Sequence, residues 1–251
     1  MRHVIGGAVI TWAATRQNSM TDLLAGVVLF LAFAVGEYVA VWYAPKSWEM
    51  VGEKNDSLSE WASVKTGFNV FVKEIDSSFQ NAFAWKDWNT VQIVFTKAIR
   101  EKTTADELKA IIGHEIGHIQ KKHPGRLMLN SAILDLSGIL GGWAFVSWWV
   151  KNMPSFNPEK IDHTFWIWIT PWAILALVFI ASREWIYYLR RKYEFEADIV
   201  ASEYTDAKTM INALKAIHPF QENEITDTIK LRETHPSLKK RLYVLSKMIS
   251  A

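Results

Sequence analysis

The sequence of 251 residues contains no cysteine. This absence excludes disulfide bonds, a cysteine nucleophile and a zinc site built from thiolates. Any metal site in the chain must therefore consist of histidine and carboxylate side chains. The absence also means that redox chemistry gives no indication of the compartment in which the protein works.

A strong excess of charge is lacking too, because the formal net charge at pH 7 is +2. Surfaces that bind nucleic acid carry a marked excess of lysine and arginine, so we expect no nucleic-acid partner. Hydrophobic residues, by contrast, make up 50% of the chain. This share is high for a soluble protein with an ordinary content of charged residues.

Much of the hydrophobic content lies in three runs, at residues 23–43, 127–150 and 164–181. Each is long enough to cross a bilayer as a helix, and many tryptophans lie near their ends, as expected at a membrane interface. We predict an integral membrane protein with three spans; the alternative is a set of buried helices in a large soluble core. A shorter run at residues 4–14 lacks the pattern of a signal peptide, and the sequence leaves open whether it adds a fourth span.

Basic residues lie beside the second and third runs, next to the two long polar segments. They are Lys121, Lys122, Arg126, Arg183, Arg190, Arg191 and Lys192. Such charges favour the cytoplasmic side, so we expect both polar segments inside and the loop at residues 151–163 outside. The chain then divides into an N-terminal segment with the first span (1–43), two halves of one polar domain (44–126 and 183–251) and a hairpin of spans (127–182).

The order His114-Glu115-x-x-His118 is typical of a zinc site that activates water. Apolar residues around it recur at helical spacing, and Thr104 with Glu107 three residues later is typical of a capping box at a helix start. One turn separates the histidines, so both can offer a ring nitrogen to one zinc ion, with Glu115 placed to polarise a bound water. The alternative is a coincidental pair of histidines on an amphipathic helix.

Two glycines, Gly113 and Gly117, lie in the middle of this predicted helix. Each costs a helix about 1 kcal/mol relative to alanine. We therefore expect another element to pack closely against this part of the helix.

A catalytic zinc site of this kind needs a third protein ligand and keeps its fourth position for water. The extended motif that would supply a third histidine is absent, because Lys121 stands in place of its glycine and Pro124 in place of its histidine. The acidic residues considered downstream are Asp135, Glu159, Asp162, Glu184, Glu194, Glu196 and Asp198. Asp135 lies in a predicted span, and Glu159 and Asp162 are expected on the opposite side of the membrane.

The last of these acids lie in one predicted helix. Glu194 and Asp198 are four residues apart and share a face, whereas Glu196 points about 160 degrees away from Glu194. We therefore predict that Glu194 binds zinc and that Asp198 accepts a hydrogen bond from the outer ring nitrogen of a ligating histidine. The alternative is a solvated acidic helix, neutralised by Arg190, Arg191 and Lys192.

Two segments ahead of the motif, residues 69–75 and 90–96, alternate β-branched or aromatic residues with polar ones. They predict a small antiparallel sheet in a mainly α, zincin-like α+β domain, accompanied by transmembrane helices. An edge strand of such a sheet can hold a peptide through main-chain hydrogen bonds, although a purely structural hairpin fits the pattern equally well.

Four ordered motifs together resemble the HtpX family of membrane zinc endopeptidases, which includes the CAAX prenyl proteases. They are HEIGH at 114–118, EFEAD at 194–198, NAF at 81–83 and HPSLKKRL at 235–242. The resemblance covers about residues 69–242 and implies one zinc ion bound by His114, His118 and Glu194, with Glu115 catalytic. Members of that family usually have two or more spans before the catalytic domain, whereas this chain has one clear span there.

The remaining motifs supply further candidate site residues. The NAF motif marks Asn81, Ala82 and Phe83 as candidates for substrate binding. Pro236 disfavours helix at His235, so we expect this histidine in a loop from which it can donate to the oxyanion. Arg241 would orient the site by pairing with a carboxylate. A helix-start histidine with a surface arginine is the alternative.

The sequence therefore predicts a membrane-anchored zinc metalloendopeptidase, and the resemblance implies that it cuts membrane or unfolded proteins in HtpX-like quality control. A CAAX-type protease for one dedicated substrate and a non-catalytic scaffold of the same fold are alternatives. An intramembrane protease is disfavoured, because charged residues surround the histidines. These are Asp106, Glu107, Lys109, Lys121 and Lys122. The oligomeric state cannot be read from the sequence.

Overall fold

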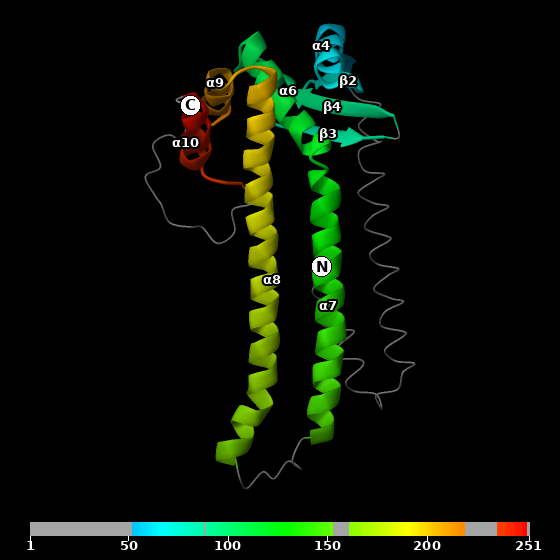
Figure 1. The fold of residues 1–251 in the computed structure, drawn as a ribbon, viewed down its shortest axis with the longest axis vertical. Helices are drawn as coiled ribbons and strands as arrows, with labels where there is room; N and C mark the ends of the chain where they lie inside the picture. The colour runs from blue at the N-terminus through cyan, green and yellow to red at the C-terminus, as the bar shows by residue number, and fades with distance from the viewer. Residues whose placement is uncertain (1–51, 88, 153–160, 219–234, 250–251) are drawn as a thin grey trace. The chain divides into compact units, whose positions relative to one another are not determined.

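The computed structural model describes residues 52–87, 89–152, 161–218 and 235–249 (Figure 1). The chain divides into two compact units. The first comprises Met1–Val41 and Met128–Ile186, and the second comprises Trp42–Leu127 and Tyr187–Ala251. The second unit is thus formed by two segments that are far apart in the sequence.

The sheet belongs to the second unit and has the order β1-β2-β4-β3. Its strands are β1 Glu53–Lys54, β2 Asn69–Ile75, β3 Ala82–Lys86 and β4 Thr90–Thr96. Strands β2 and β4 pair in parallel, whereas β1 pairs with β2 and β3 with β4 in antiparallel fashion. The sheet is therefore mixed, and the prediction of an antiparallel sheet was wrong.

The reason is the additional strand β3, which lies between the two segments predicted to be strands. Parallel neighbours need a connection that returns the chain to its starting end. Strand β3 supplies the return, and β4 then folds back between β3 and β2, so that Val72 lies opposite Ile93 in parallel register. Among the described residues, β3 forms an edge of the sheet.

Helix α4 (Asp56–Thr66) packs against β2, of which only Lys73 and Glu74 pair with β1. It begins at Asn55, whose side chain accepts a hydrogen bond from the backbone of Leu58. The hydroxyls of Ser59 and Ser63 accept hydrogen bonds from the β2 amides of Val72 and Val70, at 2.9 and 3.0 Å. These serines satisfy main-chain donors that would otherwise lie buried without a partner.

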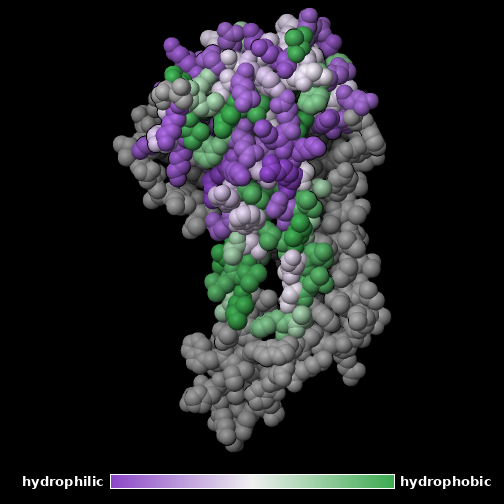
Figure 2. Space-filling model, viewed as in Figure 1, coloured by the Kyte–Doolittle hydropathy of each residue, from purple (hydrophilic) through white to green (hydrophobic). Residues whose placement is uncertain are grey.

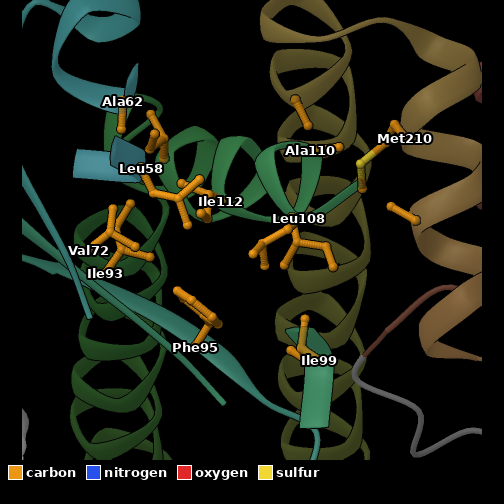
Figure 3. Close-up of a cluster of buried hydrophobic side chains, with 14 of the residues drawn as sticks. Leu58, Ala62, Val72, Ile93, Phe95, Ile99, Leu108, Ala110, Ile112 and Met210 are labelled. Atoms are coloured by element: carbon orange, nitrogen blue, oxygen red, sulfur yellow. The ribbon is translucent and has the colours of Figure 1, made fainter. Parts of the chain in front are cut away.

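The core of this unit lies around helix α6 (Ala105–Gln120), which packs against α4, β3, β4 and α9 (Ala207–Ile217). Leu108 and Ile112 of α6 lie with Ile93 and Phe95 of the sheet in one buried cluster (Figure 3). Met210 of α9 joins this cluster, as do residues of α10 (Leu238–Ile249). The short helix α5 (Lys97–Arg100) connects β4 to the loop before α6. The motif helix is thus held on several sides by apolar contacts.

Helix α8 (Ile161–Tyr204) makes the close approach expected at the two glycines of α6. A Cβ atom at Gly113 would lie 3.3 Å from Cα of Ala201, and one at Gly117 would lie 3.0 Å from Cα of Ala197. Any larger residue at Gly117 would push the helices apart. The prediction of close packing at the glycines is confirmed.

The first unit contains most of α7 (His123–Asn152) and the first part of α8. The predicted spans at 127–150 and 164–181 fall on these helices, whereas the run at 4–14 and the span at 23–43 lie outside the described residues. Within the described residues, no helix combines the length and the apolar character needed to cross a bilayer. Hydrophobic side chains are nevertheless exposed on both helices (Figure 2). They include Met128, Leu129, Ile133, Leu140, Ile174, Leu177, Val178 and Ile180.

Candidate metal centre

Helix α6 begins as the sequence predicts, with a capping box. The Thr104 hydroxyl accepts a hydrogen bond from the Glu107 amide at 3.3 Å, and the Glu107 carboxylate accepts one from the Thr104 amide at 2.8 Å. This start fixes the helix that carries His114, Glu115 and His118. Since one turn separates the two histidines, both rings project from one face.

The rings of His114 and His118 face a carboxylate from α8. Their Nε2 atoms lie 3.1 Å apart, and Glu194 places one oxygen 3.6 Å from His114 Nε2 and the other 3.7 Å from His118 Nε2. One atom from each residue can be chosen so that all three lie within 4.8 Å of one another. The structure thus brings together the three residues predicted to bind zinc.

The donor set comes close to the spacing that a zinc ion requires. Nitrogen and oxygen ligands at about 2.0–2.2 Å from one tetrahedral ion lie about 3.3–3.6 Å from each other. The separations observed here are close to this range, and two imidazoles with one carboxylate form a donor set of a kind found in catalytic zinc sites. Because the chain has no cysteine, thiolate sites for other soft metals are excluded.

His114 is held by a buried acid on its far side. Its Nδ1 lies 2.9 Å from Oδ1 of Asp198, whose side chain is 1% exposed. Arg241 of α10 donates from Nε to the other oxygen of Asp198 at 2.7 Å and also hydrogen-bonds Oδ1. A further nitrogen of Arg241 lies 3.6 Å from Glu194. Asp198 therefore accepts from His114 as predicted, and Arg241 pairs with both acids.

The charges around the donor set leave it suited to a cation. Burial by itself raises the pKa of Glu194, but a hydrogen bond from His235 and the charges of His114 and Arg241 outweigh burial and lower this pKa to about 2. Burial and the charge of His114 lower the pKa of His118 to about 3. At neutral pH, Glu194 is therefore ionised and His118 is neutral with a lone pair to offer.

Glu115 differs from the other acids of the site. Burial raises its pKa to about 7, although the charge of His114 acts in the opposite direction. The charges of Glu194, Arg241 and His235 also act on this pKa. A carboxylate with a pKa near neutrality can both take and return a proton.

The remaining predicted residues lie around this centre. His235 has its Nδ1 3.2 Å from Glu194, and its side chain is 68% exposed, so it lies on the solvent side of the donor set. Asn81, Ala82 and Phe83 belong to the edge of the sheet, where Asn81 begins the pairing of β3 with β4 by accepting from the amide of Thr96. Strand β3 packs against α6, which carries the histidines.

Two further residues contact the site but were not predicted to have a role in it. His123 lies 3.0 Å from His118, between the Nδ1 atoms, and its other nitrogen lies 2.9 Å from Glu196. Glu196 contacts His123, Arg126 and Lys192, and its helical position differs from that of Glu194 by about 160 degrees. The sequence did contain a signal for the role of His123, because this histidine lies one position before the place of the third histidine in the extended motif.

A mixed sheet beside a helix with two histidines, completed by a glutamate from a second helix, defines the class of zincin-like domains. Residues 55–249 match Peptidase family M48, and the chain belongs to this family. Among similar proteins is a protease HtpX homolog of Helicobacter acinonychis, 31% identical over 202 residues, which cover 73% of this chain and 62% of the relative. This chain thus spans less than two thirds of that relative.

Two other matches extend over nearly the whole chain. The protease HtpX of Buchnera aphidicola is 24% identical over 274 residues, covering 95% of this chain and 92% of the relative. The crystal structure of S. mikatae Ste24p aligns with a TM-score of 0.62 at 18% identity, covering 97% of this chain and 62% of that one. At this identity the structural match shows the fold alone. The resemblance drawn from the four motifs is confirmed.

Proposed function

We propose that this protein is a zinc-dependent metalloendopeptidase. The observation that carries the proposal is the convergence of His114, His118 and Glu194, next in sequence to a half-buried Glu115 whose pKa lies near neutrality. Membership of a peptidase family and the HtpX relatives support the same activity.

The protein groups then have distinct tasks. His114, His118 and Glu194 would hold the zinc ion, which when bound polarises a water molecule and the carbonyl of the scissile peptide bond. Glu115 takes a proton from the attacking water onto a carboxylate oxygen and returns it to the leaving amine. Asp198 keeps the proton of His114 on Nδ1, so that Nε2 faces the donor set.

His235 and Arg241 complete the site. The exposed ring of His235 lies next to Glu194, and it would donate a hydrogen bond to the oxygen of the tetrahedral intermediate. Arg241 holds the two acids of α8 in position. Removal of one oxyanion donor costs about 2.7–4 kcal/mol, expressed in kcat, which sets the effect expected for His235→Phe.

The substrate would bind along β3 as an additional strand. Asn81 and Asp87 both form main-chain bonds across to β4, so the alternation of an antiparallel pair directs the amides and carbonyls of Ala82 and Ala84 towards the open edge. An extended peptide can pair with these groups. An unfolded segment of a protein meets this requirement, which supports a role in quality control.

The lipid bilayer is the second partner that we propose. Apolar side chains are exposed on α7 and α8, and their exposure to water is unfavourable. This exposure supports contact of both helices with lipid acyl chains. The two segments of the second unit would then lie on the cytoplasmic side, as the flanking basic residues indicate. Processing of a single prenylated substrate is the alternative role, and the two are distinguished by the range of proteins that accumulate without the enzyme.

The test is Glu115→Gln in the full-length protein. We expect one zinc ion per chain and rapid cleavage of an unfolded model protein for the wild type, and unchanged zinc with no cleavage for the variant. Metal analysis and a gel assay provide the two measurements. Cleavage by the variant at the wild-type rate would contradict the role of Glu115, and a wild type without zinc would contradict the proposed function.

A further inference from the structure

His123 is a buried histidine outside the predicted zinc ligands, and it lies at the junction of α6 and α7. Its residue surface is 2% exposed. Between the two helices, Lys122 adopts a φ of 55°, in the left-handed region that few residues other than glycine adopt. This turn directs the chain back, so that the ring of His123 meets the ring of His118 edge-on, with centroids 5.1 Å apart.

The other side of the His123 ring is equally well defined. Its Nε2 lies 2.9 Å from Oε2 of Glu196, and its plane stacks on Tyr193 at 4.3 Å between centroids. Arg126 and Lys192 lie 3.6 and 3.7 Å from the Glu196 carboxylate. Contacts from both sides therefore fix the position and the orientation of the ring.

Only one placement of protons satisfies this chain of contacts together with a bound metal. Nε2 of His118 faces His114 and Glu194, so it must keep its lone pair for the ion, and the proton of His118 is on Nδ1. Nδ1 of His123 must then accept that proton's hydrogen bond. The proton of His123 is consequently on Nε2, from which it is donated to Glu196, an acceptor when ionised.

We propose that His123 is a positioning residue which, backed by Glu196, fixes the tautomer and the ring orientation of His118. The two metal-binding histidines are thus oriented in different ways. Asp198 contacts His114 directly, whereas Glu196 acts on His118 through an intervening imidazole. The inference rests on the proposed zinc site, because it assigns His118 Nε2 to the metal.

The test compares His123→Phe with His123→Asn by zinc affinity, measured through competition with a chelator. Phenylalanine keeps the stacking on Tyr193 but removes the acceptor, whereas the Asn oxygen can take the place of Nδ1. Loss of such an orienting partner typically weakens metal binding about 10 to 100-fold. We expect this loss for His123→Phe, and an affinity within about threefold of wild type for His123→Asn.

Two further readouts separate positioning from a general loss of structure. The visible spectrum of Co²⁺ bound in place of zinc should change in His123→Phe and be restored in His123→Asn, since it reports ligand geometry. Thermal unfolding of the metal-free proteins should be alike in the two variants. Glu203→Gln, at an exposed acid of the same helix α8, provides a control with unchanged affinity.

A double-mutant cycle tests whether Glu196 acts on His118 through His123, and it does not depend on a single variant. Glu196→Ala should weaken zinc binding about tenfold on its own and have no further effect in His123→Phe, because the link to His118 is already broken there. Additive losses would overturn the inference, as would wild-type affinity in His123→Phe. Both results would leave the zinc site intact, whereas a wild-type protein that binds no zinc would contradict the proposed function.

Discussion

Asp198 links His114, one of the three candidate metal ligands, to Arg241 near the end of the described chain. It accepts hydrogen bonds from His114 on one side and from Arg241 on the other, and it is almost completely buried. Burial disfavours its charge, but the hydrogen bonds from Arg241 and His114 outweigh burial and lower the pKa of Asp198. The acid is therefore stable as an anion only while its cationic partner is present.

Arg241→Met should lower the free energy of unfolding by about 3–5 kcal/mol, because it leaves a buried carboxylate without its counter-charge. Chemical denaturation of the metal-free protein at pH 7 measures this loss. Arg190→Met, at an exposed arginine of α8, is the matched control and should change stability by less than about 0.5 kcal/mol. A loss for Arg241→Met no larger than that control would contradict the structural role of the pair.

The same pair predicts a pH dependence of stability. Because the folded pKa of Asp198 is below its ordinary value of 3.8, the contribution of this acid is fully present above pH 3.8 and is lost as the pH falls through the folded pKa. The difference in unfolding free energy between wild type and Arg241→Met should therefore shrink below pH 3.8. A difference that stays constant between pH 7 and pH 3 would show that the carboxylate of Asp198 is not involved.

At the scale of elements, the contact between α6 and α8 decides whether the ligands meet. Helix α6 carries the two histidines, and α8 carries Glu194 and Asp198. The backbones approach most closely at Gly117, where an added Cβ would lie 3.0 Å from Cα and 3.1 Å from the carbonyl oxygen of Ala197. In sequence, Ala197 precedes Asp198 and lies three residues after Glu194, so a shift of α8 at this contact displaces both acids.

Gly117→Ala should therefore weaken zinc binding and lower stability by about 1–3 kcal/mol, the range for overpacking. Gly113→Ala, with a nearest contact of 3.3 Å, should have a smaller effect. Gly125→Ala in α7 is the control, because no atom lies within 4 Å of its added Cβ, and alanine favours a helix there by about 1 kcal/mol. Equal effects of the three substitutions, in thermal unfolding and zinc affinity, would contradict the importance of the close approach.

The edge strand gives a prediction about substrate. Ala84→Pro removes an amide that faces the open edge and leaves the hydrogen bonds to β4 in place. We expect KM for an unfolded substrate to rise about 2 to 10-fold, because the substrate loses one hydrogen bond to the strand. Zinc content should not change. The control is Ala84→Val, which keeps the amide. An unchanged KM in steady-state kinetics of Ala84→Pro would exclude β3 as the binding strand.

Local patterns predicted most of the site and the two strands at 69–75 and 90–96, but they did not predict strand β3 or how the strands pair. The capping box, the helix with His114 and His118, and the shared face of Glu194 and Asp198 all follow from spacing within one helix. Strand pairing is not local, because the alternation in 69–75 and 90–96 is the same for parallel and antiparallel neighbours. The contact of His123 with His118 depends on the left-handed conformation of Lys122. A lysine gives no indication of this conformation in a sequence.

At the scale of the whole molecule, the chain alternates between its two units. Residues of the second unit come before and after the segment Met128–Ile186 of the first. The absence of native cysteine makes the sidedness of these parts accessible to labelling, since one introduced thiol is then the sole reactive site.

Lys86→Cys should react with a membrane-impermeant maleimide only after the cells are permeabilised. Asn157→Cys, at a position outside the described residues, should react in intact cells. The expectation follows from the basic residues beside the predicted spans. The cysteine-free parent is the negative control. Labelling of position 86 in intact cells would reverse the proposed orientation.

The contact between His114 and Asp198 joins residues 84 positions apart, and Arg241 lies 43 positions further along. A nascent chain emerges from the ribosome in order, so the two histidines appear long before the acids and the arginine that complete their surroundings. Throughout that interval the site lacks a ligand and an orienting partner. The proposed zinc site is therefore incomplete when its two histidines are made, and it is complete only when residue 241 has been synthesised and packed.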